Sequence, residues 1–94
     1  MSLTPKQLSF LRSRTHALDT TVSLGKQGAG ETFLGLLGEA LARRELVKVR
    51  LPRHLEVDLK EVAQNAKAEL VQNVGRTAVF FRAGEKTKYP LPKG

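Results

Sequence analysis

Residues 69–82 place the strongest constraint on the fold, because they contain two strand-like runs on either side of Gly75 and Arg76. Glycine at the first position of a two-residue loop suits a type II′ hairpin turn. The run after this turn, 78–81, is apolar at every position, so both of its faces need cover. We therefore expect a sheet in which this last strand is central and is joined by the hairpin to 69–74.

Three further segments have the signals of helices. Thr4, Pro5 and Gln7 supply an N-cap, a first helical residue and a capping box for the first of them. Residues 31–44 have an apolar stripe at helical spacing. Asp58 is placed to cap the third helix.

Strand signals alternate with these helices. Residues 21–24 form a short run that the glycine-rich segment 25–30 interrupts, and 46–51 alternate apolar with basic side chains. The predicted order is α-β-α-β-α-β-β, a two-layer α/β sandwich of the α+β class with a mixed four-stranded sheet. We expect both β-α-β connections to make parallel pairs. Polar residues on one side of the early strands imply that part of one sheet face is uncovered.

The length of 94 residues predicts a single domain over 1–94, with a loosely ordered tail at 84–94. The chain contains no cysteine and two distant histidines, so we expect no disulfide, metal or cofactor. Residues 1–20 lack the apolar region of a signal peptide. We expect a cytoplasmic monomer that has no membrane partner and no small-molecule substrate.

The net charge of +7 favours a polyanionic partner, with nucleic acid ahead of an anionic membrane. The clearest candidate site is the loop made of Gly25, Lys26, Gln27 and Gly28, between an expected strand and an expected helix. Glycines let a phosphate approach the backbone, N–H groups at a helix start attract anions, and Lys26 adds positive charge. A plain turn is the alternative interpretation.

A second basic group crowds the end of the second helix and the strand after it. Its arginines suit phosphate recognition through their planar forks. The alternative is a solvated edge that keeps a small protein soluble. The members of this group are Arg43, Arg44, Lys48, Arg50 and Arg53.

Enzymatic chemistry is not expected. The spacing from Gly25 to Gly30 approaches that of a nucleotide-binding P-loop, but Glu31 stands where that motif needs lysine. The serines have no convincing histidine and carboxylate arrangement. Phe80 and Phe81 point to opposite faces of a strand, and we expect core packing for them, with base stacking by one of them as the alternative.

Five segments are familiar in combination: LTPKQ at 3–7, HAL at 16–18, VSLGKQG at 22–28, ELVKVR at 45–50 and VGRTAVFFR at 74–82. Together they resemble the CRM domain, named for chloroplast RNA splicing and ribosome maturation. The resemblance covers about residues 3–92 and is strongest to the stand-alone bacterial YhbY-like proteins.

The resemblance implies a fold similar to the C-terminal domain of translation initiation factor three, with the last strand between the second and third. It implies RNA binding without catalysis, and for bacterial single-domain members an association with precursors of the large ribosomal subunit. The family's GxxG loop corresponds to residues 25–28. Glu31 puts an acidic group close to that loop.

The leading hypothesis is therefore an RNA chaperone or assembly factor that binds ribosomal RNA and pre-large-subunit particles. A second hypothesis is a protein-interaction module that docks on a ribosomal protein or an assembly GTPase. A third is sequence-indifferent DNA binding. Membrane-surface binding is the least favoured, because the first helix has a narrow apolar face and no Trp anchor.

Overall fold

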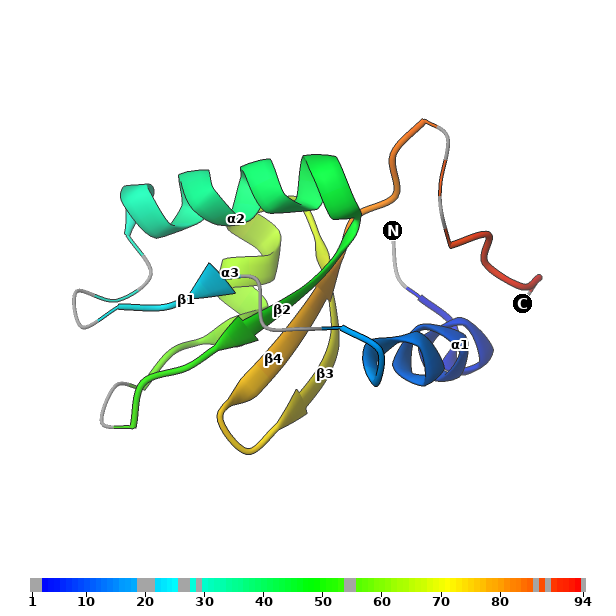
Figure 1. The fold of residues 1–94 in the computed structure, drawn as a ribbon, viewed down its shortest axis with the longest axis horizontal. Helices are drawn as coiled ribbons and strands as arrows, with labels where there is room; N and C mark the ends of the chain where they lie inside the picture. The colour runs from blue at the N-terminus through cyan, green and yellow to red at the C-terminus, as the bar shows by residue number, and fades with distance from the viewer. Residues whose placement is uncertain are drawn as a thin grey trace.

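The computed structural model describes residues 3–18, 22–25, 28, 30–53, 56–85, 87 and 89–93. Its helices and strands follow the expected order, and four strands form one mixed sheet (Figure 1). Within the described residues, no helix has the length and apolar character needed to cross a membrane. The elements are α1 (Pro5–Thr15), β1 (Val22–Ser23), α2 (Glu31–Arg44), β2 (Leu46–Arg50), α3 (Leu59–Asn65), β3 (Glu69–Val74) and β4 (Thr77–Phe81).

The predicted starts of α1 and α3 are confirmed by their hydrogen bonds. The Gln7 N–H donates to the Thr4 hydroxyl over 3.2 Å, and the Thr4 N–H donates to the Gln7 side chain over 3.0 Å, which completes the capping box. The Asp58 carboxylate accepts from the N–H groups of Lys60 and Glu61 at 3.1 and 3.2 Å. Because each cap satisfies donors that the helix itself leaves without a partner, it fixes where the helix begins.

The sheet order is β1-β2-β4-β3, so β4 is central, as its apolar faces and the family resemblance predicted. It runs antiparallel to β2 and to β3, while β1 runs parallel to β2. The expectation of two parallel pairs is therefore wrong for the second connection: β2 and β3 share a direction, but β4 separates them. The turn before β4 has Gly75 at a φ of 57°, which suits the first position of a II′ turn.

The interior strands pack into two apolar clusters on opposite faces of the sheet. On one face, Val47 and Phe80 pack with side chains of α2 and α3. On the other, Val79 and Phe81 pack with Leu11 of α1. Phe80 and Phe81 are 0% and 3% exposed, so core packing is confirmed for both and the base-stacking alternative is wrong.

Among the described residues, α1 and the C-terminal segment cover one end of the second face. Tyr89 meets Phe81 edge-on with ring centroids 6.3 Å apart, and the Gln7 side-chain amide donates to the Pro92 carbonyl over 3.1 Å. At the other end of the same face, Arg50 is exposed. Within the part of the chain that the structure describes, the sheet thus has the expected uncovered part. The loose order of 84–94 stays a prediction.

Candidate nucleic-acid interface

The loop between β1 and α2 is a tight turn. The Gly28 N–H donates to the Gly25 carbonyl over 3.1 Å. Gly28 has a φ of 85°, a left-handed conformation that glycine adopts without steric cost. A Cβ added at Gly25 would meet nothing within 4 Å, so its exposed backbone is open to an approaching ligand. Lys26 and Gln27 lie outside the described residues.

The start of α2 continues this loop. Its N-cap, Gly30, makes no side-chain hydrogen bond to the helix. The first N–H groups of an α-helix have no partner within the helix and lie at the positive end of its dipole. Glu31 in the first turn adds a negative charge that opposes this effect. The loop and the helix start therefore form an anion site with one unfavourable neighbour.

Parallel pairing with β2 brings Arg50 next to the loop. Ser23 is in register with Arg50, and the Leu24 N–H donates to the Arg50 carbonyl over 2.9 Å. Leu51 follows Arg50 and connects this end of β2 to the hairpin, because its N–H donates to the Arg76 carbonyl over 2.7 Å. The β3–β4 turn and the glycine loop consequently lie at the same end of the sheet.

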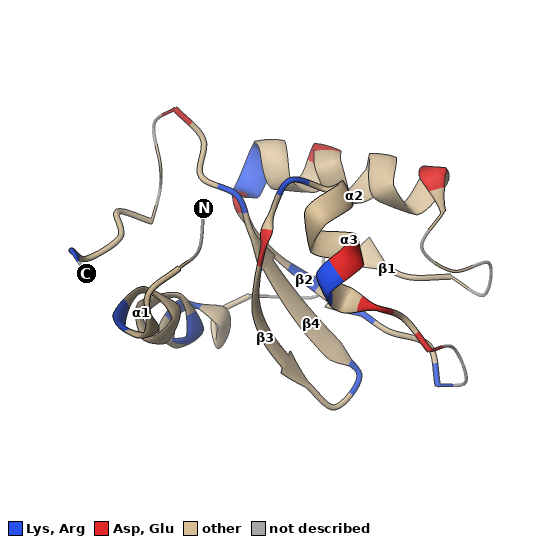
Figure 2. Ribbon diagram, turned by 180° about the vertical axis from the view of Figure 1, so that it is seen from behind, with Lys and Arg blue, Asp and Glu red and all other residues tan. Residues whose placement is uncertain are grey.

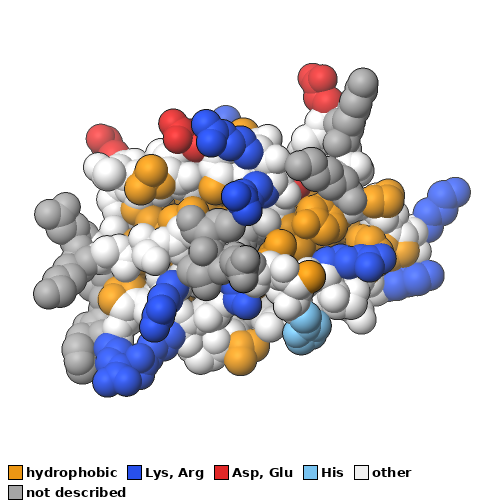
Figure 3. Space-filling model, in the orientation of Figure 1, with side chains coloured by type: hydrophobic (Ala, Val, Ile, Leu, Met, Phe, Trp, Pro, Cys, Tyr) orange, Lys and Arg blue, Asp and Glu red, His pale blue; other side chains and the backbone are white. Residues whose placement is uncertain are grey.

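We call the group of residues around the glycine loop and the hairpin turn the basic end. Its arginine side chains are all exposed. Figure 3 shows basic side chains gathered at the lower left of the molecule, around the loop that follows β2. The basic end comprises Gly25, Gly28, Arg50, Arg53 and Arg76.

Arg76 was not among the candidates from the sequence, where it was interpreted only as a turn residue. It joins the basic end because the hairpin returns beside β2, with Thr77 in register with Arg50. Two expectations from the sequence, a parallel β1–β2 pair and a central last strand, could together have indicated Arg76. That combination puts the glycine loop and the hairpin turn at one end of the sheet.

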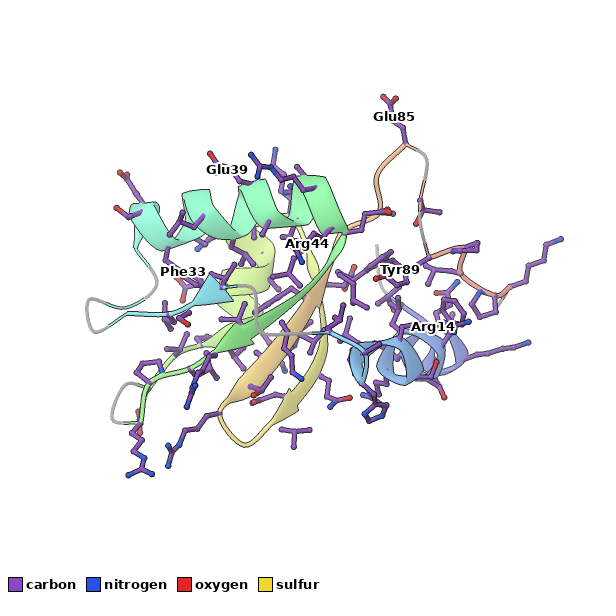
Figure 4. All side chains as sticks on the ribbon, in the orientation of Figure 1. Arg14, Phe33, Glu39, Arg44, Glu85 and Tyr89 are labelled. Carbon is purple, nitrogen blue, oxygen red and sulfur yellow. The ribbon has the colours of Figure 1, made fainter. Side chains whose placement is uncertain are left out.

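The structure separates two of the predicted site residues from this cluster. Arg43 and Arg44 lie in the last turn of α2, whereas the glycine loop precedes its first turn. A helix of 14 residues is about 20 Å long. Figure 4 labels Arg44 and shows it at the end of α2 that is remote from the loop. These two arginines therefore form a separate basic site.

Lys48 has an intermediate position on the sheet face that α1 partly covers. Its side chain is half-buried, and its ammonium group lies 3.5 Å from the Leu18 carbonyl. In β2 it is two residues from Arg50, on the same face. Lys48 thus extends the positive charge of the basic end toward α1, but with less freedom to contact a ligand.

An acidic cavity borders the glycine loop on the side toward α3. It has a volume of about 240 Å³ and lies between Gly28 and the start of α3. Glu56, Asp58 and Glu61 line it, and Figure 2 shows acidic residues at and just before the start of α3. Carboxylates repel phosphate. A polyanion would therefore approach the loop from the side of Arg50 and Arg76.

Comparison with known proteins identifies the family of the chain. The sequence pattern of the CRS1 / YhbY (CRM) domain matches residues 3–82. The chain belongs to this family. YqeI of Bacillus subtilis, named a probable RNA-binding protein, is 36% identical to this CRM domain over 90 residues, which cover 92% of this chain and 94% of YqeI. A Haemophilus influenzae protein named as RNA-binding is 31% identical over 96 residues, covering 98% of this chain and 97% of the relative.

A solved structure supports the fold of this CRM domain. The solution structure of the Staphylococcus aureus protein SAV1595, a hypothetical protein described as a candidate RNA-binding protein, superimposes with a TM-score of 0.77 at 33% identity. The match covers 97% of this chain and 100% of that one. The names of the two bacterial relatives describe RNA-binding proteins and not enzymes.

Proposed function

We propose that this CRM domain binds structured ribosomal RNA through its basic end and assists assembly of the large ribosomal subunit. The observation that carries the proposal is the convergence of a glycine turn, the uncapped start of α2 and exposed arginines at one end of the sheet. Arginine forks and free backbone N–H groups are both suited to phosphate oxygens. The RNA-binding names of the relatives support the same ligand class.

The proposed contacts are to the RNA backbone and not to stacked bases. The chain has four Phe, one Tyr and no Trp. Phe33, Phe80, Phe81 and Tyr89 pack in or against the two apolar clusters, and Phe10 lies under the guanidinium of Arg14 at 5.0 Å. Binding of single strands by stacking needs exposed aromatic side chains. The basic end as described offers charge and backbone donors instead.

The salt dependence of RNA affinity tests this mechanism. If about four phosphates are neutralised, log K should fall against log salt with a slope of roughly −3 to −4. Fluorescence anisotropy with a labelled fragment of large-subunit ribosomal RNA measures the slope. A DNA duplex of the same length serves as competitor. A flat salt dependence contradicts the phosphate contacts, and equal competition by DNA favours the DNA-binding alternative.

The assembly role predicts association with precursors of the large subunit in cells. We expect the protein to co-sediment with pre-large-subunit particles in a sucrose gradient and to be released by ribonuclease. Release follows because the proposed contacts are to RNA. If the protein stays with a protein complex after the RNA has been destroyed, the protein-interaction alternative accounts better for its association.

A further inference from the structure

A groove of about 880 Å³ opens at the end of the sheet opposite the basic end. The strand register fixes this position, since Phe81 pairs with Leu46 at one end of β2 while Thr77 pairs with Arg50 at the other. Figure 2 shows the segments beside the groove: α3 and the start of β3 on one side, and α1 with the C-terminal segment on the other. All of its lining residues belong to the described part of the chain.

The floor of the groove is apolar. Leu3, Leu70 and Leu91 line it and remain half-buried, over the buried Phe81. Leu70 packs against the cluster below α2 and α3, whereas Leu3 and Leu91 pack against the cluster below α1. Residues packed against both clusters therefore meet in this groove. An apolar partner that covered these leucines would gain binding free energy from the area removed from water.

Hydrogen bonds fix part of the groove's wall. The Arg82 guanidinium donates to the carbonyls of Ala66 and Gly38, both over 2.8 Å, and so joins the end of α3 to α2. The Gly84 N–H donates to the Glu45 carboxylate over 2.6 Å, which fixes the chain just after β4. The part of the wall that these bonds hold needs little ordering when a ligand binds.

The rim is positively charged. Among the lining residues, Lys60, Lys67 and Arg82 are basic and Glu69 is the acidic one. Lys60 and Lys67 are exposed, whereas Arg82 is held by the carbonyls described above. An occupant with acidic residues is thus favoured. A second copy of the chain, with its net charge of +7, is disfavoured by repulsion.

We propose that the groove docks an acidic amphipathic helix of a partner protein while the basic end holds RNA. Leucine-like side chains at i, i+3 or i+4 and i+7 of such a helix would cover the apolar floor. Its acidic residues would face Lys60 and Lys67 at the rim. Because the two sites lie at opposite ends of the sheet, the protein can link RNA to a protein partner. This docking does not depend on the proposed RNA function.

A synthetic peptide tests the chemistry directly. It has about 18 residues, enough to form a helix, with leucines at helical spacing and glutamates elsewhere. In NMR spectra of the ¹⁵N-labelled full chain, we expect it to shift the amide signals of Ala68, Leu70 and Ala83. Lys60→Glu combined with Lys67→Glu should weaken the peptide about tenfold or more. No binding at about millimolar peptide, or shifts confined to the basic end, would overturn the proposal.

A matched control separates the groove from net charge. Arg50→Glu combined with Arg76→Glu makes the same change in charge at the basic end, and we expect it to alter peptide affinity by no more than about twofold. A peptide with lysine in place of glutamate should bind the Lys60 and Lys67 variant better than it binds the original protein. Equal losses in both variants, or displacement of the peptide by an RNA oligonucleotide from the groove, would overturn the proposal. The spectra also verify that each variant is folded.

Discussion

Replacing Arg50 and Arg76 together by glutamate is expected to weaken RNA binding by about a hundredfold in ~0.1 M salt. Because each phosphate contact releases counterions, it raises the RNA affinity about tenfold at that salt concentration. This variant removes two such contacts and adds repulsion. The slope of log K against log salt should become shallower by about two. Both side chains are exposed, so the melting temperature should stay close to that of the unchanged protein.

The matching control is Arg43→Glu combined with Arg44→Glu, at the far end of α2. It changes the net charge by the same amount, yet it should cost RNA affinity only about tenfold or less, by weaker long-range attraction. Anisotropy titrations of both variants with the same RNA fragment make the comparison. If the two variants lose equal affinity, binding follows overall charge and the basic end has no special part in it.

Phe80→Ala is expected to lower the free energy of unfolding by about 3–5 kcal/mol. Phe80 is 0% exposed on the central strand, in the cluster shared by the sheet, α2 and α3. Its truncation removes apolar contacts and leaves a cavity where three elements meet. Small domains are stable by only about 5–15 kcal/mol, so much of the total stability would be lost. Urea denaturation at 25 °C measures the change.

Val74→Ala provides the comparison for this result. Val74 lies on the edge strand β3 and is 61% exposed, so its truncation should change the unfolding free energy by less than about 0.5 kcal/mol. A loss below about 1 kcal/mol for Phe80→Ala would contradict the central position of β4 and its cover on both faces.

Local features of the fold were predictable from the sequence because they depend on neighbours in the chain. The expected helix over 31–44 is observed as Glu31–Arg44, and the Thr4 and Asp58 caps are in place. The apolar run at 78–81 predicted a central strand, which the sheet order confirms. Apolar periodicity indicates which side of an element is buried, but it does not name the partner. The pairing of β4 with β2, which separates β2 from β3, was therefore beyond residue patterns alone.

In the candidate site, too, local features were predictable and long-range contacts were not. The glycine loop is local, and its position between a strand and a helix was predicted correctly. The basic group from Arg43 to Arg53 was treated as one patch because its members are close in sequence. An extended chain advances about 3.3 Å per residue, so Arg44 and Arg50 fall at opposite ends of β2. Arg76 lies far along the chain and reaches the loop only through the register of β4 with β2.

The central position of β4 also affects how the chain folds during synthesis on the ribosome. Among the helices and strands of the described residues, β4 comes last in the chain, yet it lies between β2 and β3 in the sheet and joins them. Until residues 77–81 have left the ribosome, β2 has β1 on one side and lacks its neighbour on the other side. An unpaired strand edge of this kind is prone to aggregation. We therefore expect the nascent chain to complete its sheet late, in a single step, when β4 inserts between β2 and β3.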